Sequence, residues 1–475
     1  MTSLDPAVTL SDQYARFGLS LQLRDVPRTL RTRAKHLILD AVGIALASRS
    51  YPYAGVSLAA FSELGSGTSP VIGYGRRLAL RDAAMMNGIL IHGLDFDDTH
   101  SRGVIHSTTS ALPAVFALAD RDDLSGAELL SAYIVAMEVS TRVASAAKGG
   151  FHQAGFHPTG MVGAFGCAVA AARLLHLDEA RAAHAQGVVL SMAAGSLEFL
   201  EDGAWTKRAH PGFAAAAGIT AATLAKHGFT GPRSAYEGRF GLYASHLGKR
   251  LDAADQQLAT EGLGSAWQID EVAIKPLPAC HFTHAVADAA IALYQEHGFS
   301  AQNLDSIDRV IARVPRGTVE VVCEPLEPKR KPVTSYDAQF SVPYIVATAL
   351  LKGRFTLDDL EPAALADPAV LALATRVDYE IDPDSTFPRH YTGEVIVERS
   401  DGSRVAHREA INRGCAERPV SNDDIASKFY ANAQRTVSRS AAEQIAQAVL
   451  QLDERPARAL ADTLAGTTES SRTPS

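Results

Sequence analysis

Apolar residues at helical spacing run through the first half of the chain. Residues 27–46 place Leu30, Ala34 and Leu37 on one face, which predicts an amphipathic helix. Ser125, with Glu128 three residues later, matches a capping box at the start of a further helix. The same apolar pattern predicts helices over 82–90, 110–118, 127–147, 160–175 and 180–192. We see no convincing strand pattern before about residue 265.

The pattern changes between about residues 270 and 405, where short strands are expected among helices. Alternating or β-branched runs predict strands over 307–314, 319–322, 377–381, 393–399 and 405–408. Residues 266–274 fit a strand or an extended connection, 335–353 fit one helix, and 357–360 begin a short one. Residues 423–464 are helical again. The fold class expected is therefore mainly α, with a large all-helical domain and an inserted smaller α+β domain.

The composition is that of an ordinary globular protein, with 47% hydrophobic and 21% charged residues among 475. A net charge of −8 argues against nucleic acid as a partner. The N-terminal residues lack the order of a signal peptide, and no stretch offers the roughly 20 apolar residues of a membrane helix. The four cysteines are widely spaced and form no metal or disulfide pattern. We therefore expect a cytoplasmic protein with reduced thiols.

Residues 92–106, which read HGLDFDDTHSRGVIH, concentrate histidines and aspartates between apolar flanks. Such a density of charge is costly to bury unless the charges are paired or used. One interpretation is a solvated loop in which Asp97 and Asp98 cap a helix. A second is a metal site of histidine and carboxylate ligands. The order of the aspartates, D-x-D-D, differs from known magnesium motifs, and the second acidic motif that accompanies those is missing. The third is metal-free acid–base chemistry by a histidine and a carboxylate.

Two later stretches also carry candidate chemistry. His157 directly precedes a helix rich in Ala and Gly, where backbone amides favour an anion. A basic cluster of Lys207, Arg208 and His210 precedes another Ala-rich helix. Lys275 precedes Pro276 and Pro278, which hold the chain extended. Three further candidate side chains follow at the start of the next helix. These three are Cys280, His281 and His284.

Three strings, in this order and spacing, resemble the MmgE/PrpD family. They are HGLDFDDTH, GFHPTGMVGAFG and KPLPACHFTHAVADAA, and the resemblance covers about residues 10–460. The family includes 2-methylcitrate dehydratase, cis-aconitate decarboxylase and iminodisuccinate epimerase. The resemblance implies an all-helical domain over 1–268 and 410–465, an α+β lid over 269–409, and a disordered tail over 466–475. It also implies a homodimer that uses no metal or organic cofactor, with its site in the cleft between the domains.

Matching the strings residue by residue gives the site that the resemblance implies. The catalytic set consists of His106, His157, Asp95, Lys207 and Lys275. The lysines would hold substrate carboxylates, and His106 or His157 would move a proton. We assign substrate binding to Thr99, Cys280, His281 and Tyr336. The expected function is a cofactor-independent lyase, a dehydratase or decarboxylase of a small di- or tricarboxylic acid.

Two departures from the family pattern leave the reaction open. Decarboxylases of the family carry a histidine where this chain has Cys280, and the stretch after Thr99 is one residue longer here. An epimerase or isomerase of a similar acid is the first alternative, since two histidines suit a two-base reaction. A metal-dependent hydrolase and a catalytically silent binding protein are the others. We expect the α+β domain to move as a lid, because an interdomain site must admit substrate.

Overall fold

The computed structural model describes residues 8–466, which form two compact units. The larger unit runs to Gly93, resumes over Asp97–Val272 and returns from Ser421 onward. The smaller unit holds Leu94–Phe96 and Ala273–Val420. The fold is mainly α, as expected. The domain bounds drawn from the sequence and the interdomain cleft stay predictions, and the tail after Gly466 lies outside the described residues.

The larger unit is built almost entirely of helices, and most follow the apolar pattern of the sequence. The expected capping box is present, because Ser125 accepts from the Glu128 backbone N–H and Glu128 accepts from that of Ser125. Within residues 8–466, no helix combines the length and the apolar character needed to cross a bilayer. The helices are α1 (Leu10–Ser20), α2 (Arg28–Ser48), α3 (Pro52–Leu64), α4 (Leu80–His92), α5 (Thr108–Arg121), α6 (Gly126–Ala146), α7 (Gly150–Gln153), α8 (Pro158–Leu174), α9 (Glu179–Leu190), α10 (Phe199–Asp202), α11 (Thr206–Lys226), α12 (Leu242–Leu247), α20 (Asn422–Ala433), α21 (Arg439–Leu450) and α22 (Ala457–Ala465).

Small residues let α4, α5, α8 and α11 pack at very short range. A Cβ placed on Gly88 of α4 would lie 2.5 Å from the backbone N of Gly212 in α11. A Cβ on Gly163 of α8 would lie 2.6 Å from Ser110 Oγ of α5 and 3.6 Å from the Ala214 Cβ of α11. The four helices therefore approach almost backbone to backbone, and this closeness brings the starts of α5, α8 and α11 together.

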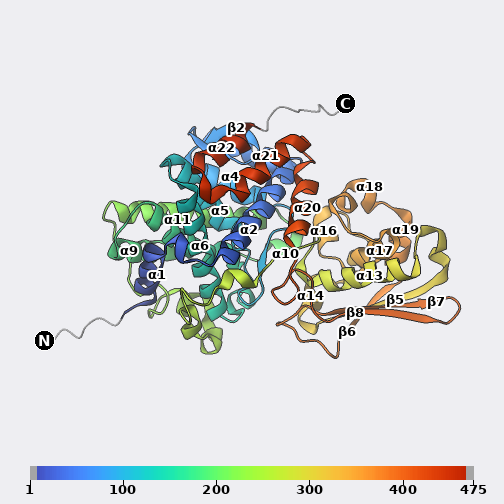
Figure 1. Ribbon diagram of the computed structural model, residues 1–475. Coiled ribbons are helices and arrows are strands. Elements are labelled where there is room, and N and C mark those ends of the chain that lie inside the picture. Colours follow the sequence, from blue (N-terminus) through green and yellow to red (C-terminus); the bar gives the residue numbers. More distant parts are fainter. Residues whose placement is uncertain (1–7, 467–475) are drawn as a thin grey trace. The chain divides into compact units, whose positions relative to one another are not determined.

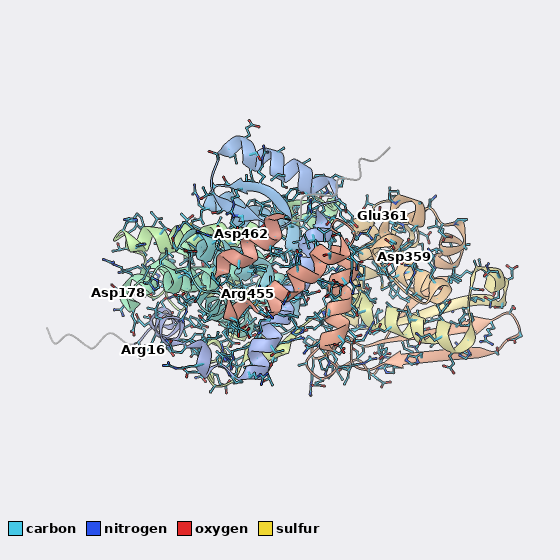
Figure 2. The ribbon with its side chains drawn as sticks, turned by 45° about the horizontal axis from the view of Figure 1, so that its top comes forward. Arg16, Asp178, Asp359, Glu361, Arg455 and Asp462 are labelled. Atoms are coloured by element: carbon cyan, nitrogen blue, oxygen red, sulfur yellow. The ribbon has the colours of Figure 1, made fainter. Side chains whose placement is uncertain are left out.

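The C-terminal helices pack against the N-terminal ones, as Figure 1 shows for α20, α21 and α2. Lys428 of α20 reaches the buried Asp40 of α2, with Nζ 2.8 Å from Oδ1. Two residues labelled in Figure 2 mark how the last helix is held. The Arg455 carbonyl accepts from the Gly126 N–H at 2.8 Å, and Asp462 lies 3.4 Å from an Arg77 guanidinium nitrogen.

A β-hairpin in the larger unit corrects the expectation that strands begin only near residue 270. Strands β1 (Ser69–Val71) and β2 (Tyr74–Leu78) pair antiparallel. Gly73 between them has a φ of 73°, which suits a tight turn. Arg76 and Arg77 interrupt the apolar alternation, so the sequence pattern does not identify β2. A two-residue strand, β3 (Thr99–His100), lies in the histidine-rich stretch.

The smaller unit is a four-stranded sheet with helices packed on it (Figure 1). Strand order is β6-β5-β7-β8, with β5 and β6 parallel and the other pairs antiparallel. Helices α13 and α17 pack against each other and against the sheet. The strands are β5 (Ile307–Val314), β6 (Val377–Ile381), β7 (Gly393–Arg399) and β8 (Arg404–Glu409), as expected. The helices are α13 (His284–His297), α14 (Val319–Val322), α15 (Leu326–Arg330), α16 (Ser335–Gln339), α17 (Val342–Lys352), α18 (Pro362–Leu365) and α19 (Pro368–Ala374).

Three local expectations about this region need correction. Residues 319–322 form the short helix α14 and not a strand, because Cys323 N bonds back to the Val319 carbonyl and closes a turn. The expected single helix over 335–353 breaks into α16 and α17, where Ser341 caps the second helix through Tyr344 N. In 266–274 the extended part is only β4 (Val272–Ala273), after the 3-10 turn η4 (Gln268–Glu271).

We predict that Gly88→Ala lowers stability although alanine favours helices over glycine by about 1 kcal/mol. The new methyl group would meet the α11 backbone, and such overpacking costs about 1–3 kcal/mol. Gly55 of α3 is the matched control, since no neighbouring atom lies within 4 Å of its Cβ position. Gly55→Ala should raise the melting temperature and Gly88→Ala should lower it. Equal shifts in both variants would contradict the close-packing argument.

Candidate active site

The chain leaves α4 at Gly93, where Arg208 holds the backbone at the start of the histidine-rich stretch. The Arg208 Nε donates to the Gly93 carbonyl at 2.9 Å, and its guanidinium stacks over the Tyr53 ring at 4.9 Å. The side chains that follow are buried, with Asp97 1% and Asp98 3% exposed. The interpretation of this stretch as a solvated loop is therefore wrong. Burial of this kind demands partners for the carboxylates.

Asp97 lies between two imidazoles of the larger unit. Its Oδ2 is 2.9 Å from His92 Nδ1 and 3.2 Å from His106 Nδ1. The two imidazole centroids are 5.1 Å apart. One buried carboxylate therefore orients both histidines, which is the role that a carboxylate usually plays beside a working imidazole. Neither His92 nor Asp97 is among the site residues predicted from the sequence.

The hydrogen bonds of His106 identify its tautomer. Its Nδ1 faces the Asp98 carbonyl at 2.6 Å as well as the Asp97 carboxylate, and both of these are acceptors only. Thr99 Oγ1 is 3.3 Å from the same nitrogen. Nδ1 must therefore carry the proton, so Nε2 of the neutral ring has the lone pair. With 14% of its side chain exposed, His106 is suited to act as a base at Nε2.

A short loop between His100 and Ile105 returns the chain to the Asp97 carboxylate. His100 N donates to the Ile105 carbonyl at 2.8 Å, and Val104 between them has a φ of 51°, which is rare for a β-branched residue. His100 itself is a structural residue, since its Nδ1 accepts from the Gly103 N–H at 3.2 Å. Burial lowers the pKa of His100 to about 3, so it is neutral at pH 7.

Asp98 points away from the histidines and serves the start of α5. Its Oδ1 lies 3.4 Å from the Thr108 backbone N, and Thr108 Oγ1 bonds both to Oδ2 and to the Tyr133 hydroxyl. Burial raises the pKa of Asp98 to about 7. Asp98 thus bonds the first backbone N–H of α5, but the N-cap residue of that helix is Ser107 and neither aspartate.

His157 is the N-cap residue of α8, and no side chain caps that helix start. The Thr159 hydroxyl in its first turn accepts from the His106 N–H at 3.1 Å, which joins the α8 and α5 starts. The His157 and His92 rings stack at 5.5 Å with an interplanar angle of 20°. Lys207 lies in the first turn of α11, whose start also has no side-chain cap. Helix starts and a lysine together favour a bound anion.

His210, predicted only as part of a basic cluster, contacts His157 directly. The two Nδ1 atoms are 3.0 Å apart. Burial, helped by His92 and Lys207, lowers the pKa of His210 to about 4. Burial also lowers the pKa of His157 well below its usual value, and His92, Lys207, His210 and His106 add to this effect. The pair is neutral at pH 7.

In the smaller unit, Lys275 and Asp95 form a buried ion pair. Lys275 Nζ lies 2.7 Å from Asp95 Oδ1 and 3.0 Å from the Asp95 carbonyl, with 1% and 6% of the side chains exposed. Asp95 has a φ of 49°, a left-handed conformation that aspartate tolerates better than most residues. Gln339 of α16 donates to the Leu94 carbonyl beside it. The segment 94–96 is therefore fixed by groups of the smaller unit.

The remaining expected residues also lie in the smaller unit. Cys280 is 9% exposed, and its N–H donates to the Gln339 carbonyl at 2.9 Å. Asn412 accepts from the Tyr391 N–H through Oδ1, so its Nδ2 must donate to His281 Nε2 at 3.0 Å. His281 therefore carries its proton on Nδ1. Tyr336 lies on α16 with its ring 4.8 Å from that of Phe340.

The structure thus groups the expected residues in two sets. Thr99, His106, His157 and Lys207 lie in the larger unit around the joined helix starts, and the smaller unit holds the others. Three residues missed as site members, His92, Asp97 and His210, complete the first set. No group of three or more His, Cys, Asp or Glu residues in the described range 8–466 is arranged to hold a metal ion.

Comparison with known proteins gives a consistent match over nearly the whole chain. Residues 12–253 match the MmgE/PrpD N-terminal domain and residues 277–454 match the MmgE/PrpD C-terminal domain. A human cis-aconitate decarboxylase is 30% identical over 464 residues, which cover 94% of this chain and 92% of the relative. Cis-aconitate decarboxylase from Aspergillus terreus is 29% identical, covering 93% and 92%. The cis-aconitate decarboxylase-like protein oryM of Aspergillus oryzae is 27% identical, covering 95% and 96%.

We predict that Asp97→Asn lowers the pKa of the His106 imidazole by about 1 unit, because it removes the negative charge that favours the imidazolium. NMR titration of histidine ring protons would measure the shift. Asp120→Asn is the control, since that buried carboxylate pairs with Arg77 and not with an imidazole. An unchanged His106 pKa in Asp97→Asn would remove Asp97 as the group that orients this histidine.

Proposed function

The chain belongs to the MmgE/PrpD family, and on this basis we propose that it is a cofactor-independent lyase acting on a small di- or tricarboxylic acid. The named relatives are cis-aconitate decarboxylases, which supports decarboxylation or the related dehydration as the reaction. The proposed catalytic groups are His106 and His157 with Lys207, Lys275 and Asp95. Thr99, Cys280, His281 and Tyr336 are proposed to shape substrate binding.

The single observation that carries the proposal is the histidine cluster at the joined starts of α5, α8 and α11. Two uncapped helix starts and Lys207 supply positive potential without a metal ion. The imidazoles of His157 and His210 beside them are neutral at pH 7. A site of this kind can hold substrate carboxylates and still offer an uncharged nitrogen to take a proton.

The proposed step begins with His106 Nε2, whose lone pair is directed away from Asp97. In a dehydration, Nε2 removes a proton from the carbon next to a carboxylate, and the C–H electron pair forms the double bond as hydroxide leaves. The leaving oxygen takes that proton from the His106 imidazolium, which returns to its neutral form. In a decarboxylation, the C–C bond breaks, carbon dioxide leaves, and the carbon accepts a proton from a protonated imidazole. Lys207 stabilises the carboxylate on which negative charge develops.

The buried Lys275–Asp95 pair supports a role for the smaller unit in binding a substrate carboxylate. A lysine held by one carboxylate is a preformed cation, and a substrate carboxylate would compete for it. By the resemblance of the 275–290 string to the family, Cys280 takes the place of a histidine that the family's decarboxylases carry. We propose that Cys280 shapes the pocket without a covalent role.

An epimerase of a similar acid is the second candidate, and one observation favours it. The rings of His106 and His157 are 6.3 Å apart and tilted by 52°, so they are two distinct proton-transfer groups. Two such bases on opposite faces of one carbon would exchange its proton without eliminating a group. Deuterium incorporation without elimination would identify this activity.

The experiment is an NMR screen of di- and tricarboxylic acids in deuterated water with EDTA-treated protein. We expect one acid to lose carbon dioxide or water at a rate that EDTA leaves unchanged. His106→Ala should lower turnover by roughly 10²–10⁴-fold, and Lys275→Ala should chiefly weaken substrate binding. Cys280→Ser should retain measurable turnover.

Each other outcome of the screen has a definite meaning. Activity lost with EDTA and restored by one divalent ion would replace the proposal with a metal-dependent hydrolase. Near-wild-type turnover in both His106→Ala and His157→Ala would remove the histidines from the mechanism. His227→Ala, at the exposed C-cap of α11, is the control for replacing a histidine outside the cluster.

We also propose that the protein forms a homodimer through the outer face of α11. Phe213 and Leu224, 53% and 39% exposed, are eleven positions apart and so share one helix face. Exposed apolar side chains at such spacing are typical of an interface between subunits. Sedimentation velocity should show a dimer for the wild type and a smaller species for Phe213→Glu. Val56→Glu, a change at an equally exposed residue of α3, should remain dimeric; a dimeric Phe213→Glu would contradict this interface.

A further inference from the structure

The contact between His157 and His210 is a hydrogen bond between two rings of the same kind. Their Nδ1 atoms are 3.0 Å apart, and the side chains come from the start of α8 and the first turns of α11. His157 is 4% and His210 8% exposed. The backbone fixes His157 as well, because its N–H donates to the Gly195 carbonyl at 2.9 Å.

A hydrogen bond between two Nδ1 atoms requires one donor and one acceptor. A neutral imidazole carries a single proton, on either Nδ1 or Nε2. Two neutral rings that meet through Nδ1 must therefore be opposite tautomers. When His210 holds its proton on Nδ1, His157 holds its own on Nε2; when His157 donates from Nδ1, its Nε2 has a lone pair. The state of His210 thus decides whether His157 presents an acid or a base at Nε2.

We propose that His210 is a positioning residue that sets the tautomer of His157 and receives its proton during turnover. This inference rests on the proposed function, in which His157 exchanges a proton with the substrate. In the base form, the substrate C–H bond breaks, its electron pair stays on the substrate, and the proton binds His157 Nε2. The Nδ1 proton of His157 then crosses to His210 Nδ1. His157 ends neutral with its proton on Nε2, and the positive charge rests on His210.

The groups around His157 and His210 disfavour a permanent positive charge on either imidazole. The titratable groups that face His157 are His92, His106, Lys207 and His210, and those that face His210 are His92 and Lys207 as well as His157. Phe199 packs its ring edge against both imidazoles, with centroids 5.7 Å and 5.9 Å away. Each of these titratable neighbours is a histidine or a lysine that lowers the pKa of the pair, so a lasting positive charge on either imidazole is disfavoured. A proton taken from the substrate is therefore readily given back.

Histidine-selective ¹⁵N NMR of the full chain at pH 7 tests the inference without any substrate. We expect His157 and His210 to show opposite tautomers, or averaged signals that change together. In His210→Phe, the His157 signal should change tautomer population. In His210→Asp, the carboxylate should accept from His157 Nδ1, hold the lone pair on Nε2 and raise the His157 pKa by at least about 1 unit. The same tautomer in both rings, or a His157 signal indifferent to both variants, would overturn the proposal.

The kinetic test uses the pH–rate profile of the acid found in the substrate screen. His210→Phe should lower turnover at least about tenfold, as expected when a catalytic imidazole loses the group that holds its tautomer. His210→Asp should shift the acidic limb of the profile to higher pH. His184→Phe, which removes a half-buried histidine bonded to the Gly231 carbonyl, is the control and should keep the wild-type profile.

The two proposals fail in different ways. If the NMR shows opposite tautomers but no acid is turned over, the proposed function fails while the pairing of the two rings stands. If an acid is turned over and the profile of His210→Phe matches the wild type, then His210 has no part in the proton transfer and the inference is overturned.

Discussion

The spacing of α4 and α11 is the constraint on which the candidate site depends. Gly88 and Gly212 meet where these helices cross, and no side chain separates the two backbones. His92 lies one turn after Gly88, and His210 lies two residues before Gly212. The crossing therefore fixes the distance between two side chains that come from helices more than a hundred residues apart. A larger residue at Gly88 or Gly212 would push the two helices apart and so displace the His92 or His210 imidazole.

The electrostatics of the cluster depend on which group each histidine contacts. Asp97 is the carboxylate that contacts the imidazoles, and it binds His92 and His106 through their Nδ1 atoms. The Nδ1 atoms of His157 and His210 bond to each other, and burial keeps both rings neutral at pH 7. The cluster thus holds two kinds of histidine within one fold region: one kind is bound to a carboxylate, and the other is bound to a second imidazole.

Sequence alone identified the elements whose signals are local. The capping box at Ser125 and the apolar faces of the long helices gave correct helix positions, and the alternating runs gave β5 and β7. The strand β2 was not predicted because the consecutive Arg76 and Arg77 interrupt its apolar alternation. Residues 319–322 were predicted as a strand because they are mostly β-branched, but such residues also occur in short helices. The family strings led to His106 and His157. The partners of these residues could not be found that way, since the His157–His210 contact joins residues 53 positions apart and no periodicity records it.

The assignment of Leu94–Phe96 to the smaller unit has a consequence for how this protein can be divided. These three residues sit inside a string that otherwise belongs to the helical unit, yet their anchors are Lys275 and Gln339. A fragment made of residues 273–420 alone would bury the Lys275 ammonium without the carboxylate that neutralises it. A chimera that exchanged only that fragment between relatives would combine a lysine from one parent with an aspartate from the other. The smaller unit is thus discontinuous in sequence. An exchange of this unit between relatives must include Leu94–Phe96 together with residues 273–420.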